Sequence, residues 1–150
     1  MIRSSNVYDH SSTPHRVEQS KGFGVSGQAS STETGKYGED IAVQALRTHG
    51  YEIIEQNWRC RIGEVDVVAQ QGGEWVFVEV KARQGVSHGT PEEGVTEVKR
   101  SRLLQVGAAY LEEHGHEDAA WRIDVVAIEL GQTGKVRRLA IYRDAVRADG

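Results

Sequence analysis

The strongest constraint on the fold is a pair of stretches, residues 64–70 (EVDVVAQ) and 74–82 (EWVFVEVKA), in which apolar and charged residues alternate. Such period-two alternation is typical of β-strands, and the two glycines between the stretches favour a tight turn. The sequence therefore predicts an antiparallel hairpin. If the strands turn at these glycines, Asp66 lies directly opposite Glu79.

The charged residues of this hairpin fall on one face. They are Glu64, Asp66, Glu79 and Lys81, whereas Val65, Val67, Val78 and Val80 point to the other face, which we expect to be core. Like charges placed opposite each other on neighbouring strands are destabilising, so the Asp66–Glu79 pair needs a partner. Two converging carboxylates form a hard oxygen site suited to Mg²⁺ or Mn²⁺, and a neighbouring lysine can hold a phosphate or orient a water. The pattern indicates phosphodiester cleavage.

A simpler interpretation stays open at this point. The face can be merely solvated, with Glu64 and Lys81 forming a cross-strand ion pair. The metal site also depends on register, because an odd-length loop would send Asp66 and Glu79 to opposite faces.

The rest of the chain supplies one helix before the hairpin and alternating elements after it. Apolar spacing predicts the following elements: a helix over 37–49, a strand over 51–58, a helix around 103–111, a buried strand over 121–130 and a polar edge strand over 135–143. The order αβββαβ with a trailing strand implies a mixed α/β (α+β) sheet, with an antiparallel meander and flanking helices. Residues 1–34 are rich in Ser, Thr, Gly and Gln, which predicts a disordered arm before a domain at 35–150.

Composition bounds the class of protein. The chain has 150 residues, a net charge of −4 and one cysteine, and no apolar run approaches the length of a membrane span. We expect a single cytoplasmic domain without disulfides or a membrane partner. Zinc spacing, a Walker loop, a dinucleotide fingerprint and a nucleophile elbow are all lacking from the sequence. Nucleic-acid binding remains open, since it needs only a local basic stripe.

Four segments in order carry a family resemblance: GED (38–40), NWRCRIGEVDVVA (57–69), FVEVKAR (77–83) and RIDVVAI (122–128). They resemble the PD-(D/E)xK, restriction-endonuclease-like nucleases, especially archaeal Holliday-junction resolvases, and within that fold the YraN-type family of predicted endonucleases. Val65 stands where the nuclease signature has proline.

The resemblance implies a restriction-endonuclease-like core and a metal-dependent DNA endonuclease, with DNA favoured over RNA, activity on branched DNA and a tendency to form homodimers. Asp66 and Glu79 would then bind Mg²⁺ or Mn²⁺, Glu39 would be a third acid in the metal site, and Lys81 would act at the phosphate or the water. Glu39 also suits a purely structural role, because an acid near a helix amino terminus is favoured by the helix dipole. A non-catalytic nucleic-acid-binding module of the same fold is the alternative function.

Arg59, Arg61 and Arg83 flank the acidic pair in sequence and are candidate phosphate contacts. Lys99 and Arg102 belong, with Arg100, to a second basic group on the second predicted helix and are further candidates, although a charged run on a helix is more often a solvated face. Trp58 suits either stacking on a base or a place in the core. Asp124 lies in a motif that echoes the one around Asp66 but has no Glu-x-Lys partner, so we expect it to be structural.

Overall fold

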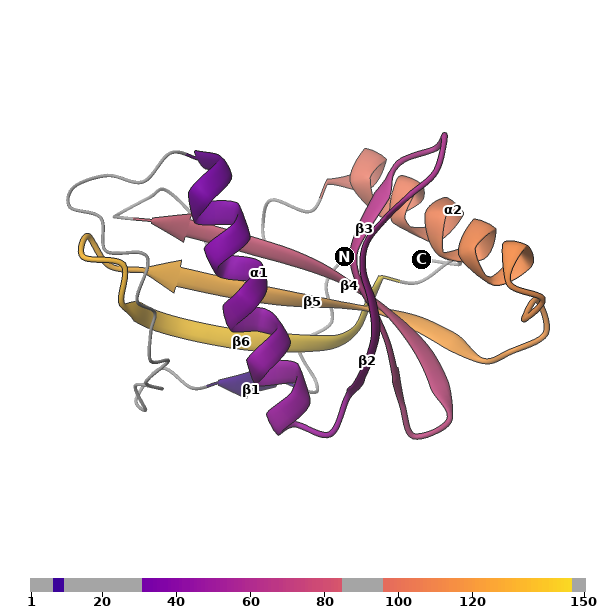
Figure 1. The fold of residues 1–150 in the computed structure, drawn as a ribbon, viewed down its shortest axis with the longest axis horizontal. Coiled ribbons are helices and arrows are strands. Elements are labelled where there is room, and N and C mark those ends of the chain that lie inside the picture. Colours follow the sequence, from indigo (N-terminus) through magenta and orange to yellow (C-terminus); the bar gives the residue numbers. More distant parts are fainter. Residues whose placement is uncertain (1–6, 10–30, 85–95, 147–150) are drawn as a thin grey trace.

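The computed structural model describes residues 7–9, 31–84 and 96–146. These residues form a mixed sheet with two helices (Figure 1). The elements are β1 (Val7–Asp9), α1 (Ser31–Thr48), β2 (Glu52–Arg59), β3 (Glu64–Gln71), β4 (Glu74–Gln84), α2 (Glu97–Glu113), β5 (Trp121–Leu130) and β6 (Val136–Val146). The sheet order is β1-β6-β5-β4-β3-β2, and among these strand pairs only β4–β5 is parallel. The predicted αβββαβ order with a trailing strand and a mixed sheet is confirmed, and it is consistent with a restriction-endonuclease-like core.

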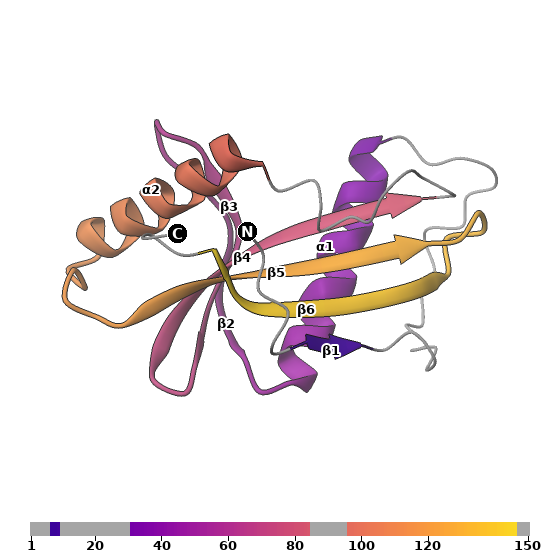
Figure 2. The same ribbon diagram turned by 180° about the vertical axis from the view of Figure 1, so that it is seen from behind.

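The sheet is covered on both faces, and each helix has its own core. On one face, Ile41, Ala42 and Leu46 of α1 pack in a cluster with strand residues such as Val78 and Val126. Helix α1 crosses in front of the strands in Figure 1 and lies behind them in Figure 2. A second cluster joins Leu103, Val106, Tyr110 and Leu111 of α2 to Trp58, Phe77 and Ile123. Neither described helix is long and apolar enough to cross a membrane.

The β3–β4 hairpin has the predicted register, but its pairing stops early. The paired positions run from Gln71↔Glu74 to Val67↔Val78. Beyond that point β4 pairs only with β5, as far as Gln84, while β3 stays paired with β2. The sheet therefore splits between β3 and β4 where the acidic residues lie.

The split also changes the predicted core face. Val67, Val78 and Val80 lie on the α1 side as expected, whereas Val65 joins the cluster on the α2 side. A regular strand would keep Val65 and Val67 on the same face. The prediction for Val65 was wrong because β3 turns away from β4 and follows β2.

Two boundaries differ from the sequence predictions. Strand β6 is not an edge strand, because β1 pairs with it antiparallel. An edge accepts a strand through backbone hydrogen bonds alone, so composition gave no signal of β1. Helix α1 begins at Ser31, before the predicted domain start at residue 35. The rest of the predicted disordered arm, residues 1–6 and 10–30, lies outside the described residues, as does the predicted loop within 85–95.

Candidate functional site

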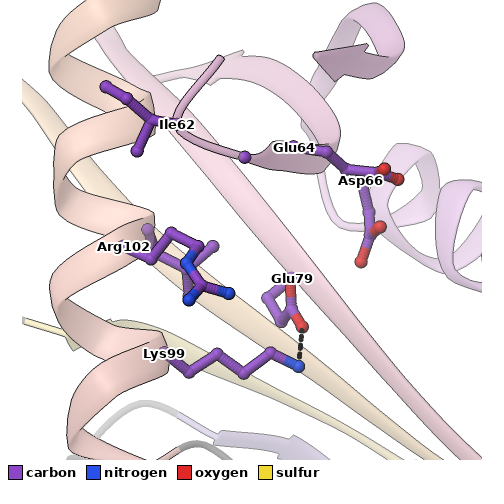
Figure 3. A pocket seen from close by; sticks show the side chains of 8 residues that line it. Ile62, Glu64, Asp66, Glu79, Lys99 and Arg102 are labelled. Carbon is purple, nitrogen blue, oxygen red and sulfur yellow. Dashed lines mark ion pairs between the residues drawn. The ribbon is translucent and has the colours of Figure 1, made fainter. Parts of the chain in front are cut away.

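A pocket of about 300 Å³ opens at the split between β3 and β4. Its lining comes from the β2–β3 turn, from β3 and β4, and from the amino-terminal half of α2: Ile62, Gly63, Glu64, Asp66, Glu79, Lys99, Arg102 and Leu103. Figure 3 shows the carboxylates of Asp66 and Glu79 on one side and the Lys99 and Arg102 side chains reaching in from α2. Acidic and basic groups thus meet in one partly enclosed space.

Asp66 is held by the backbone of the neighbouring strand. Its Oδ2 accepts a hydrogen bond from the Val80 N–H at 2.8 Å, which bridges the two strands after their own pairing has ended. Burial and, next, the negative charge of Glu79 raise the pKa of Asp66 to about 7, with smaller contributions from Glu39 and Glu64 and some opposition from the Val80 hydrogen bond. The predicted repulsion between Asp66 and Glu79 is therefore present.

Glu79 is buried, at 8% exposure, and two lysines share one of its oxygens. Lys99 Nζ lies 3.2 Å and Lys81 Nζ 3.7 Å from Glu79 Oε2. Burial and the approach of Lys99 lower the pKa of Lys81, although Glu79 opposes this shift. Burial would also lower the pKa of Lys99, but its hydrogen bond with Lys81 and the charge of Glu79 outweigh burial and raise it.

Glu39 does not line the pocket, but it is close enough for its charge to act on Asp66. Burial raises its pKa, a hydrogen bond from Asn57 opposes the rise, and the charge of Glu64 adds to it. Asn57 itself has a φ of 55°, in the left-handed region that asparagine tolerates better than most residues. Asn57 was not singled out from the sequence, since a single Asn within a strand pattern gives no signal of a positive φ.

The donors present suit a hard divalent cation as a pair rather than as a triad. Across residues 7–9, 31–84 and 96–146, no three His, Cys, Asp or Glu side chains gather closely enough to hold a metal ion. Mg²⁺ is commonly bound through one or two carboxylates while it keeps several waters. Asp66 and Glu79 meet that requirement, whereas Glu39 is not among the residues that line the pocket.

The basic candidates fall into two groups. Arg59 forms an ion pair with Glu64 at 3.2 Å across β2 and β3, in place of the Glu64–Lys81 pair of the alternative, solvated-face interpretation. Arg61 is exposed at the β2–β3 turn, and Arg83 is half-buried on β4.

On α2, Lys99 and Arg102 line the pocket itself. Lys99 also forms the ion pair with Glu79 described above, a contact that its position in a charged helical run did not reveal. Ile62, 43% exposed, was also missed, because only the fold brings its turn against α2.

One aromatic candidate, Trp58, and one acidic candidate, Asp124, have structural roles. Trp58 is buried and meets the Tyr110 ring edge-on, with centroids 5.1 Å apart, which places it in the core rather than on a base. Asp124 is fully buried and accepts hydrogen bonds from the Tyr51 hydroxyl at 2.7 Å, from Arg122 Nε at 3.0 Å and from the Asp144 N–H at 2.8 Å. The expected structural role of Asp124 agrees with this network.

Comparison with known proteins identifies a family whose match covers the four motif segments of the sequence. A model of the uncharacterised protein family UPF0102 matches residues 38–128. UPF0102 protein STH1475 of Symbiobacterium thermophilum is 46% identical over 107 residues, which cover 71% of this chain and 91% of that protein. A UPF0102 protein of Roseiflexus castenholzii is 44% identical over 101 residues, covering 67% and 82% respectively.

Among solved structures, that of Pyrococcus furiosus SfsA in complex with Ca²⁺ is 17% identical in sequence, with a TM-score of 0.38 over 83% of this chain and 67% of that one. The family match spans α1 from Gly38, the whole pocket lining and β5 as far as Ile128. The chain therefore belongs to the uncharacterised protein family UPF0102, the YraN-type family that its motifs resemble.

Proposed function

We propose that this protein is a Mg²⁺- or Mn²⁺-dependent DNA endonuclease. The observation that carries the proposal is the Asp66–Glu79 pair at the split in the sheet, with Lys81 and Lys99 on the same Glu79 oxygen. Membership of UPF0102 suggests a nuclease-like role, while the relatives' names state no activity. Two converging carboxylates beside an amine suit phosphodiester hydrolysis better than the other chemistries considered.

The protein groups would divide the work in the following way. Asp66 and Glu79 hold the cation, which when bound stabilises charge on the phosphate and lowers the pKa of a water. The Val80 N–H fixes the orientation of the Asp66 carboxylate, so this ligand is preorganised. Lys81 lies at the reacting phosphate or the attacking water. Glu39, held by Asn57, orients solvent at the rim of the site.

The proposed substrate is a polyanion, and basic residues on three elements are available to contact its phosphates. Arg61 at the exposed turn, Arg102 on α2 and Arg83 on β4 lie on three elements around the acidic pair. Phosphate contacts from several elements would position DNA across the pocket without reading its sequence. A structure-specific enzyme acting on branched DNA fits such a contact set.

A cleavage panel tests the proposal directly. Single-stranded, duplex, flap and four-way DNA are incubated with the full chain in Mg²⁺ or Mn²⁺, beside Glu79→Gln and a chelator control. We expect metal-dependent cleavage by the parent that Glu79→Gln abolishes. If the parent binds branched DNA but cuts nothing with either metal, the protein is the non-catalytic binding module; if Glu79→Gln cuts as well as the parent, the site is placed wrongly.

A further inference from the structure

Lys99 is the residue of this site that the metal-dependent reaction leaves unexplained. It lies in the first turn of α2, where the Thr96 side chain accepts a hydrogen bond from the Lys99 N–H at 3.2 Å. From there its ammonium crosses the pocket to Glu79 Oε2 at 3.2 Å, as Figure 3 shows. The cap fixes the start of the helix and hence the origin of the lysine side chain.

Charge balance at Glu79 does not require Lys99. Lys81, two residues along the same strand, already lies 3.7 Å from the same oxygen. One ammonium suffices to neutralise one carboxylate. Lys99 therefore gives the group of Glu79, Lys81 and Lys99 a net positive charge. Asp66 faces the same space, and its carboxylate offsets this positive charge when it is ionised.

A divalent cation bound between Asp66 and Glu79 would therefore meet the Lys99 ammonium at close range. A divalent cation and an ammonium about 4 Å apart repel each other even in a well-solvated site, by an amount equivalent to about 30-fold in affinity. The Lys99 side chain is 37% exposed on a flexible stem, so it can leave Glu79 without disturbing the helix. Arg102, one turn further along α2, lines the same pocket and makes that side attractive to a phosphate.

We propose that Lys99 stands in for the metal at Glu79 in the metal-free protein and transfers to a DNA phosphate when the metal arrives. Lys99 is thus a positioning residue that couples metal binding to DNA binding. Because coupling between two ligands is reciprocal, DNA should tighten metal binding by the same factor by which metal tightens DNA binding. The inference rests on the proposed function for its choice of DNA, but its metal half stands on the ion pair alone.

Calorimetric titration of Mn²⁺ into the metal-free full chain tests the inference. We expect Lys99→Met to bind Mn²⁺ more tightly than the parent by up to about 30-fold, since the competing charge is gone. Lys99→Arg, which keeps the charge, should return affinity to within about twofold of the parent. Arg102→Met is the matched control, because Arg102 lines the pocket without an ion pair to Glu79 among the described residues, and its Mn²⁺ affinity should stay near the parent's.

A second titration measures DNA affinity with and without Ca²⁺ as a hard cation. The parent should show Ca²⁺-enhanced DNA binding, and Lys99→Met should lose most of that enhancement while Arg102→Met keeps it at lower overall affinity. Circular dichroism and thermal unfolding confirm that each variant is folded, and Lys99→Gln replaces Lys99→Met if the latter is not.

The outcomes separate this inference from the proposed function. If the parent cleaves DNA but Lys99→Met binds Mn²⁺ no more tightly, the inference is overturned and the nuclease stands. If Lys99→Met binds Mn²⁺ more tightly while the parent cleaves nothing, the stand-in role is supported and the nuclease falls. If neither the parent nor Lys99→Met binds Mn²⁺, both are overturned.

Discussion

The carboxylate of Asp66 and the backbone of Val80 form a hydrogen bond, 2.8 Å from Oδ2 to N, just past the last paired residues of β3 and β4. The Asp66 side chain thus satisfies an N–H of β4 that the split has left without a backbone partner on β3. The same contact fixes Asp66 beside Glu79, so the irregularity in the sheet and the acidic pair have one structural origin. An unmatched N–H at this place would be destabilising, which ties the site to the stability of the fold.

Metal binding should depend on the carboxylates of Asp66 and Glu79 and not on the total negative charge of the pocket. We expect Asp66→Asn and Glu79→Gln each to weaken Mn²⁺ binding at least tenfold, because each removes one of two hard oxygen ligands. Glu64→Gln is the matched control, since Glu64 lines the same pocket but pairs with Arg59. Calorimetry measures all three, and equal losses in all three variants would show that only the summed charge of the pocket matters.

Stability should fall with rising pH because of Asp66. Its pKa is about 7 in the folded protein and 3.8 in the unfolded reference, so between these values the folded state holds a proton that the unfolded state lacks. The stabilisation is complete below about pH 4 and is lost as pH rises through 7. In a chelator, Asp66→Asn should therefore gain stability over the parent by on the order of 2 kcal/mol between pH 5 and pH 8.5. Urea unfolding at the two pH values measures this, and a pH-independent difference would contradict the assignment.

The hairpin could be predicted from the sequence, whereas the split within it could not. Glycines and alternating valines specify a turn and a register, and the register is confirmed as far as Val67↔Val78. The alternation continues unbroken through Val65, so nothing local indicates that β3 leaves β4 there. Past that point β3 stays paired with β2 and Val65 packs in the α2-side cluster, and these are tertiary contacts.

The candidate site, too, could be predicted only in part. Asp66, Glu79 and Lys81 are close in a hairpin, so their proximity could be predicted from spacing alone. Lys99 and Asn57 reach the site through helix packing and a left-handed residue, neither of which has a local pattern.

Lys81 should act in the chemical step more than in binding. If it stabilises charge on the phosphate or orients the water, Lys81→Met should lower single-turnover cleavage by at least about 100-fold while changing DNA affinity by less than about threefold. Arg61→Met is the contrasting variant, because an exposed phosphate contact should reduce affinity and lower the salt slope of binding by about 1. Affinity against salt, measured beside cleavage, distinguishes the two, and the reverse result would exchange their roles.

The buried network around Asp124 should carry stability and no chemistry. Asp124→Asn removes the fully buried partner of Arg122, while Glu74 still pairs with the same guanidinium. The loss should therefore fall at the low end of the range for breaking a buried pair, about 3 kcal/mol. Tyr51→Phe removes a single hydrogen bond to the same carboxylate and should cost only about 1 kcal/mol. Urea unfolding measures both variants. Cleavage by folded Asp124→Asn at the parent's rate is the expected companion result, and loss of metal binding in that variant would make Asp124 part of the site.

Gly38 sets how closely α1 approaches β4, and thereby where the next residue, Glu39, lies. A Cβ built at Gly38 would come within 2.6 Å of the Ala82 Cβ, a separation that two carbon atoms cannot adopt without movement of the helix or the strand. Overpacking of this kind costs about 1–3 kcal/mol, against a gain of about 1 kcal/mol from replacing glycine within a helix.

Gly38→Ala should therefore be destabilising by up to about 2 kcal/mol in net terms, despite the better helix former. Gly35→Ala is the matched control, because it lies in the same helix with nothing within 4 Å of a new Cβ. It should stabilise the protein by about 0.5–1 kcal/mol. Thermal and urea unfolding compare the two variants. Equal stabilisation by both would mean that α1 packs against β4 more loosely than this contact requires, and that Glu39 is free to approach the acidic pair.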